Sequence, residues 1–255
     1  MNIKTKIRKL LLNQLGYYVH EVKTMPVGTD FGQDLKHKIG LNPDVIFDIG
    51  ANVGQTVDFY QDLYPKANIY SFEPVPSTFK HLKDHCADMS NVSCFDIAFG
   101  EKEERQTIKV MADANSVLNS LNTDVQADLC SSDEDYDSVE IKVKRLDDFA
   151  KQEGVKHIDL LKVDTEGFEM PVLRGASELL DSQAISTVIC EAGFMRTNTR
   201  NTYFGDINDF LEAKGYALFE VCEMGHLGFK VGRHYGNLLY VSKKYRESQY
   251  RNWQV

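Results

Sequence analysis

The sequence predicts an α/β fold in which helices connect the strands of a mostly parallel β-sheet. Short apolar runs alternate with stretches of helical periodicity, and glycine or proline separates many of them. Two further segments alternate apolar and polar residues, which is typical of half-exposed antiparallel strands. These observations predict seven main strands, the last of them antiparallel, together with an inserted β-hairpin.

The first half of the chain supplies three main strands and the hairpin. The predicted strands are Val45–Ile49, Ile69–Phe72 and Val92–Ala98, and the hairpin pairs Thr107–Met111 with Val139–Lys144. A helix after the first strand ends at Pro65, and a second helix begins near Ser77, a residue type that caps helices. Within the hairpin, the acidic and polar segment 119–138 is predicted to be a long surface loop.

The second half continues the alternation of strands and helices. The predicted strands are Ile158–Val163, Thr187–Cys190, Tyr216–Cys222 and Leu238–Val241, and the predicted helices are Leu146–Gln152, Pro171–Leu180 and Gly205–Lys214. The last two strands are expected to pair around the loop Glu223–Gly236. We therefore expect a helical extension at 1–40, the main domain at 41–245 and a tail at 246–255.

Composition limits the classes of partner and compartment. The net charge of −9 argues against a broad nucleic-acid surface, because such a surface carries excess positive charge. The five cysteines are scattered without a CxxC pair, which favours reduced thiols and a cytoplasmic protein. The sequence holds no apolar run of about 20 residues that would span a bilayer.

The N-terminal segment is basic and partly apolar. Its cations are Lys4, Lys6, Arg8 and Lys9, and its apolar stretch Leu10–Leu12 is too short for a signal-peptide core. We expect an amphipathic helix that packs on the main domain. The alternative is weak peripheral contact with an anionic membrane.

A glycine-rich turn follows the first predicted strand and opens a helix. It runs from Asp48 through Gly50, Asn52 and Gly54 to Gln55. Glycines let the backbone approach a ligand closely, and the free N–H groups of a helix start favour an anion. Alone, this pattern fits many nucleotide-binding folds, or a tight turn that binds nothing.

Acidic residues also end the next two predicted strands. Glu73 closes the second strand, where a carboxylate can accept hydrogen bonds from both hydroxyls of a ribose. Asp96 lies near the end of the third strand and is a candidate acceptor for an adenine amino group; the alternative is a turn carboxylate. Because carboxyl ends of parallel strands share one edge, Asp48, Glu73 and Asp96 together predict a ligand cleft there.

The fourth and fifth predicted strands bring more acids to the same edge. Asp164 and Glu166 follow the fourth strand, and Glu191 follows the fifth. We consider Asp164 the best candidate for chemistry, with Glu191 lining the same cleft. Glu166 either lines the cleft or orients the next helix.

Several of these motifs resemble the FkbM family of methyltransferases. They are DIGANVGQ at 48–55, FEP at 72–74, LKVDTEGFE at 161–169, VLRGA at 172–176 and YGNLLYV at 235–241. The resemblance covers roughly residues 40–242 and implies a class I methyltransferase Rossmann-like fold with S-adenosyl-L-methionine as methyl donor. It implies that donor binding involves Asp48, Gly50, Asn52, Gly54 and Glu73, to which position adds Gln55 and Asp96.

The family is associated with O-methylation of sugars and secondary metabolites, so we expect a hydroxyl of a sugar, glycan or metabolite as acceptor. Such an acceptor must lose a proton, and the candidate bases are Asp164, His226 and His234. Glu191 is a further candidate catalytic residue. No metal site is expected, although Asp164 with Glu191 is an alternative place for a divalent cation. The competing functions are a nicotinamide-dependent oxidoreductase and a donor-binding scaffold without catalysis.

Overall fold

The computed structural model describes residues 3–17, 19, 21, 25–111, 136–198, 200–225 and 234–253. The chain divides into two compact units, residues 1–41 and 42–255. The first unit contains α1 (Ile3–Leu15), α2 (Phe31–Gln33) and the π-helix η2 (Asp34–Ile39). No described helix is both long enough and apolar enough to cross a membrane.

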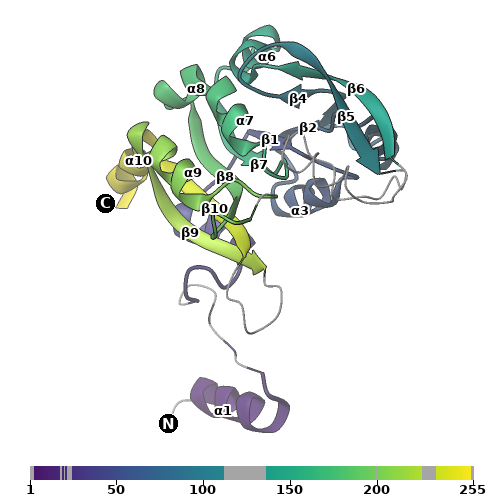
Figure 1. The fold of residues 1–255 in the computed structure, drawn as a ribbon. Helices are drawn as coiled ribbons and strands as arrows, with labels where there is room; N and C mark the ends of the chain where they lie inside the picture. The colour runs from purple at the N-terminus through teal and green to yellow at the C-terminus, as the bar shows by residue number, and fades with distance from the viewer. Residues whose placement is uncertain are drawn as a thin grey trace. The chain divides into compact units, whose positions relative to one another are not determined.

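The second unit is built on a seven-stranded sheet with the order β3-β2-β1-β7-β8-β10-β9 (Figure 1). Its strands are β1 (Val45–Ile49), β2 (Asn68–Phe72), β3 (Val92–Phe95), β7 (Ile158–Val163), β8 (Ile185–Gly193), β9 (Tyr216–Gly225) and β10 (Tyr235–Ser242). The pairs among β3, β2, β1, β7 and β8 are all parallel, whereas β10 is antiparallel to both β8 and β9. The predicted seven-stranded, mostly parallel sheet with its last strand antiparallel is therefore confirmed.

Helices of the second unit pack on the sheet in two clusters. The helices are α3 (Gln55–Leu63), α4 (Pro76–His85), α6 (Leu146–Gln152), α7 (Glu169–Gly175), α8 (Ser177–Asp181), α9 (Phe204–Ala213) and α10 (Lys243–Trp253). Apolar residues of α6, α7, α8 and α9 form the main core with the sheet strands, and residues of α3 and α4 form a smaller cluster. Burial of apolar surface in these clusters stabilises the layers.

Two predicted helices differ in detail from the structure. The helix expected near Ser77 begins at Pro76 with Val75 as its N-cap, because the fixed φ of proline suits a first helical turn. The helix expected at Pro171–Leu180 is two short helices, α7 and α8, that meet at Ala176.

The inserted β-hairpin is confirmed and forms a small sheet of its own. It contains β4 (Ala98–Phe99), β5 (Glu104–Met111) and β6 (Tyr136–Lys144) in the order β4-β6-β5 (Figure 1). β5 and β6 are antiparallel, and β4 pairs in parallel with β6. The single strand predicted at Val92–Ala98 is wrong, since the chain leaves the main sheet after Phe95 and joins the inserted sheet at Ala98.

Two predicted loops are shorter than expected or fall outside the described residues. Residues 112–135, which include most of the acidic segment 119–138, are not among the described residues. β6 already begins at Tyr136. The loop expected at Glu223–Gly236 is flanked more closely by strands, because β9 continues to Gly225 and β10 begins at Tyr235.

Candidate functional site

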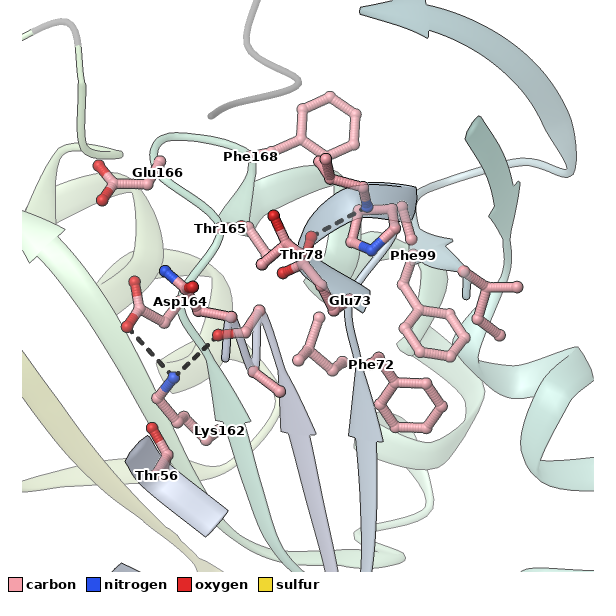
Figure 2. A pocket seen from close by; sticks show the side chains of 18 of the residues that line it. Thr56, Phe72, Glu73, Thr78, Phe99, Lys162, Asp164, Thr165, Glu166 and Phe168 are labelled. Atoms are coloured by element: carbon pink, nitrogen blue, oxygen red, sulfur yellow. Dashed lines mark hydrogen bonds and ion pairs between the residues drawn. The ribbon is translucent and has the colours of Figure 1, made fainter. Parts of the chain in front are cut away.

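A cavity lies at the carboxyl ends of β1, β2 and β7 and is also lined by the inserted sheet (Figure 2). The turn after β1, the end of β2 and the segment after β7 supply its polar lining, and Phe72, Ile97, Phe99, Ile108 and Phe168 supply much of its apolar lining. The edge that carries it is the one that the strand-end acids predicted.

The backbone of the turn after β1 lies close to the backbone of the first residue after β7. Gly50 has φ +82, and a Cβ built on it would lie 1.8 Å from the carbonyl oxygen of Asp164. The N–H groups of Gly50 and Ala51 both donate to the carbonyl of Phe72, each at 3.0 Å. Gly54 has φ +106 and caps α3 without any side-chain hydrogen bond. The close approach explains why glycine stands at position 50.

Glu73 is a buried carboxyl group on the cavity lining. Its side chain is 8% exposed, and one carboxylate oxygen accepts a hydrogen bond of 2.9 Å from the Val75 N–H. Burial raises the pKa of Glu73 to about 7, and backbone hydrogen bonds only partly oppose that rise. The group is therefore ready to gain stabilisation from hydrogen-bond donors of a ligand.

A buried lysine that the sequence reasoning missed lies between two of the predicted acids. Lys162 pairs in register with Asp48 across β7 and β1. Its Nζ lies 3.3 Å from Asp48 Oδ1 and 3.2 Å from Asp164 Oδ2. Asp48 is fully buried and is not among the lining residues, whereas Lys162 and Asp164 line the cavity (Figure 2).

Three carboxyl groups gather at the ends of β7 and β8. Carboxylate oxygens of Asp164, Glu166 and Glu191 lie within 4.8 Å of one another. Burial, followed by the neighbouring carboxylate of Asp164, raises the pKa of Glu191 to about 9. Burial also raises the pKa of Glu166 to about 7, against the opposing charge of Arg200. At neutral pH Glu191 therefore holds a proton.

Within the part of the chain that the structure describes, these acids are the one group with the spacing of a metal site. Each acid already has a partner of its own: Lys162 for Asp164, Arg200 at 2.9 Å for Glu166, and the Asn201 amide for Glu191. We therefore describe them as an acid cluster and not as metal ligands.

The structure brings most of the sequence-predicted residues together. Gly50, Asn52, Gln55, Glu73 and Asp164 line the cavity. Asp48 and Gly54 lie outside the lining, where they support the turn, and Glu191 lies beside Asp164 in the acid cluster.

Two other predicted residues, Asp96 and His234, are not among the lining residues of the cavity. Asp96 is 53% exposed and pairs with Lys142 at 2.8 Å, while its neighbour Ile97 faces the cavity. His226 lies outside the described residues. His234 has a buried Nε2 with no hydrogen-bond partner among the described residues.

Several known proteins similar to this chain are methyltransferases. The methyltransferase FkbM domain model matches residues 48–218. Methyltransferase 1 of Beauveria bassiana is 28% identical over 189 residues, which cover 68% of this chain and 72% of that protein. The 2-O-methyltransferase NoeI of Sinorhizobium fredii is 27% identical over 145 residues, which cover 54% of this chain and 60% of that protein.

Among solved structures, the precorrin-6y C5,15-methyltransferase of Geobacter metallireducens aligns over 90% of this chain and 96% of its own, with 13% identity and a TM-score of 0.45. That likeness is too low to carry an argument about function. The family match is different, because it spans most of the second unit and includes both the glycine-rich turn and the acid cluster. The chain belongs to the FkbM methyltransferase family and is a methyltransferase.

Proposed function

We propose that the protein transfers a methyl group from S-adenosyl-L-methionine to a hydroxyl oxygen of a sugar, glycan or secondary metabolite. The observation that carries this proposal is the buried Glu73 carboxyl at the end of β2, aimed into a cavity that the Gly50 turn also lines. Family membership supports methyl transfer and removes the support for a nicotinamide-dependent oxidoreductase.

The donor side of the cavity fits an adenosine with an amino-acid tail. Glu73 accepts hydrogen bonds from the ribose hydroxyls. The first turn of α3, which has no side-chain cap, faces the carboxylate of the tail. Ile97, Phe99 and Ile108 offer an apolar wall for the adenine. The predicted role of Asp96 in adenine binding stays a prediction, and its exposed position favours this wall instead.

The acceptor side is the acid cluster. When bound, the donor supplies an electrophilic methyl group on a sulfonium. The protein has to orient a hydroxyl toward it and accept the proton that the hydroxyl loses. Asp164 suits this task, because its carboxylate lines the cavity and is held by Lys162.

Glu191, which the sequence places as a catalytic residue of the same cleft, suits hydrogen-bond donation better than proton acceptance. A carboxyl group that holds a proton at neutral pH donates a hydrogen bond and is a poor base. We therefore place Glu191 as a group that orients the acceptor. His226 and His234 remain alternative bases.

An oxygen acceptor is supported by the name of one relative. NoeI is a 2-O-methyltransferase, which places its methyl group on oxygen. The clustered carboxyl groups of this chain also suit hydroxyl-rich molecules, because carboxyl oxygens accept hydrogen bonds from hydroxyls. No feature of the described residues selects one acceptor within that class.

The test is transfer of label from methyl-labelled S-adenosyl-L-methionine to a panel of glycans, sugar nucleotides and hydroxylated metabolites. We expect a labelled product that resists mild alkaline hydrolysis, because a methyl ether survives conditions that cleave a methyl ester. Glu73→Ala should abolish the label. Donor binding without transfer to any member of the panel would support the scaffold alternative, and label on nitrogen would contradict the proposed acceptor class.

A further inference from the structure

Lys162 joins the two halves of the site in a way that no local motif reveals. Its side chain is 10% exposed, and its ammonium contacts Asp48 on one side and Asp164 on the other. It also lies 3.4 Å from the carbonyl oxygen of Gly50, and Figure 2 shows it below Asp164 at the ends of the strands. One cation therefore contacts the base of the donor turn and the first acid of the acceptor side.

Asp48 depends on this lysine. Both of its carboxylate oxygens are buried, and the partner that the described residues give them is the Lys162 ammonium, 3.3 Å from Oδ1. Burial raises the pKa of Asp48, and the charge of Lys162 opposes that rise. Burial alone would lower the pKa of Lys162, but the carboxylates of Asp164 and Asp48 outweigh burial and raise it. The opposite charges thus favour the charged form of Lys162 and oppose the effect of burial on Asp48.

The charge balance of this trio matters for the ligands that the proposed function requires. Two carboxylates and one ammonium leave one net negative charge beside the cavity. S-adenosyl-L-methionine carries a sulfonium cation, whereas its product S-adenosylhomocysteine has a neutral sulfur in that position. A negative site favours the cation, and too strong a preference would stabilise the bound donor more than the transition state, in which that charge is dispersed.

We propose that Lys162 is a positioning residue that holds Asp48 and Asp164 and sets how strongly the site prefers the cationic donor to its neutral product. This inference rests on the proposed function, because it assumes that the donor binds in the cavity beside Lys162. It predicts that the ratio of the two dissociation constants follows the net charge of the trio.

The variants Asp48→Asn and Lys162→Met/Asp48→Asn form a matched pair. The first leaves Lys162 with Asp164, a neutral pair, and the second leaves Asp164 alone with one negative charge. The preference for the donor is the dissociation constant of the product divided by that of the donor. This ratio should be about tenfold higher in the double variant than in Asp48→Asn, because a unit charge in a partly buried site acts at this scale. The double variant should also return to roughly the wild-type ratio. Lys162→Met alone should show the strongest preference for the donor.

Isothermal titration calorimetry with both ligands measures the two dissociation constants for each variant. Thermal unfolding of each variant checks that it folds. If Lys162 had a structural role alone, its substitution would weaken the binding of both ligands equally and leave the ratio of their dissociation constants unchanged. A constant ratio across wild type, Asp48→Asn and the double variant would overturn the inference. If Lys162→Met does not fold, the other two variants still decide. Failure of the wild type to bind either ligand would instead overturn the proposed function.

Discussion

The donor side and the acceptor side of this site are built in different ways. On the donor side, the lining comes from two short segments: the tight turn directly after β1, and the buried carboxyl of Glu73 directly after β2. On the acceptor side, Asp164, Glu166 and Glu191 come from two strand ends. Their partner Lys162 lies on β7, and their partner Arg200 lies in the segment after β8.

The contrast separates a shape requirement from a charge requirement. The donor turn tolerates no Cβ at Gly50, because the backbone of Asp164 fills the space. The acid cluster instead has unusual protonation, since burial raises the pKa of Glu191 to about 9. Substitutions in the Gly50 turn should therefore act through geometry, and those of the acids in the cluster through charge.

The largest effect is expected for Gly50→Ala. A Cβ at φ +82 and 1.8 Å from a backbone oxygen forces the turn to move, so binding of S-adenosylhomocysteine should fall below detection. The free energy of unfolding should drop by roughly 3 kcal/mol or more in urea titrations. Gly154→Ala is the control, because φ is +70 there but nothing lies within 4 Å. It should cost only about 1 kcal/mol and leave binding intact.

Asp164→Asn should reduce the rate of label transfer about 100-fold, because the amide cannot accept the proton of the acceptor. Donor affinity should fall by about tenfold, much less than the rate, because the substitution removes one negative charge from the group of Asp48, Lys162 and Asp164 but keeps the shape of the side chain. Glu191→Gln is the matched control: Glu191 already holds a proton at neutral pH, so the amide should retain most of the rate at pH 7. Equal losses in both variants would break the assigned division of labour.

The affinity for S-adenosylhomocysteine should depend on pH through Glu73. Its pKa of about 7 lies above the ordinary value, so the group gains a proton as pH falls through 7 and loses acceptor strength for ribose hydroxyls. Between pH 8 and pH 6 the dissociation constant should rise about tenfold. Glu73→Gln should bind weakly at both values, whereas Glu166→Gln should keep the pH dependence although the pKa of Glu166 is also about 7. A flat profile in wild type would contradict the role of Glu73.

The smallest effect is expected for Asp96→Asn. Its side chain is exposed and paired with Lys142, away from the cavity lining. Donor affinity should stay within about twofold, as is usual for exposed ion pairs. Ile108→Ala, by contrast, removes part of the apolar wall and should weaken binding severalfold. A larger loss for Asp96→Asn than for Ile108→Ala would restore the role that the sequence suggested for Asp96.

The sequence predicted what local pattern determines. The bounds of β1 and β7 agree residue for residue, since each is a short apolar run with turn residues beyond it. The third strand was wrong, because apolar residues lie on both sides of Asp96 while the chain changes sheets there. A hydrophobic pattern reports burial and not the partner strand.

The site shows the same limit. Residues of the glycine-rich turn and Glu73 were identified because their spacing to the strands is local. Lys162 was missed because a lysine inside an apolar strand has a partner only once the register with Asp48 is known. The signal was present as a charged residue in IDLLKV, in a run that otherwise predicts burial. Only the three-dimensional pairing showed what it neutralises.

The most direct test is a crystal structure of the protein with S-adenosylhomocysteine bound. We predict that the ribose hydroxyls lie within hydrogen-bonding distance of the Glu73 carboxylate, and that the amino-acid tail lies against the turn at Gly50. The adenine should contact Ile108. A ligand bound elsewhere, or a ribose turned away from Glu73, would contradict the account.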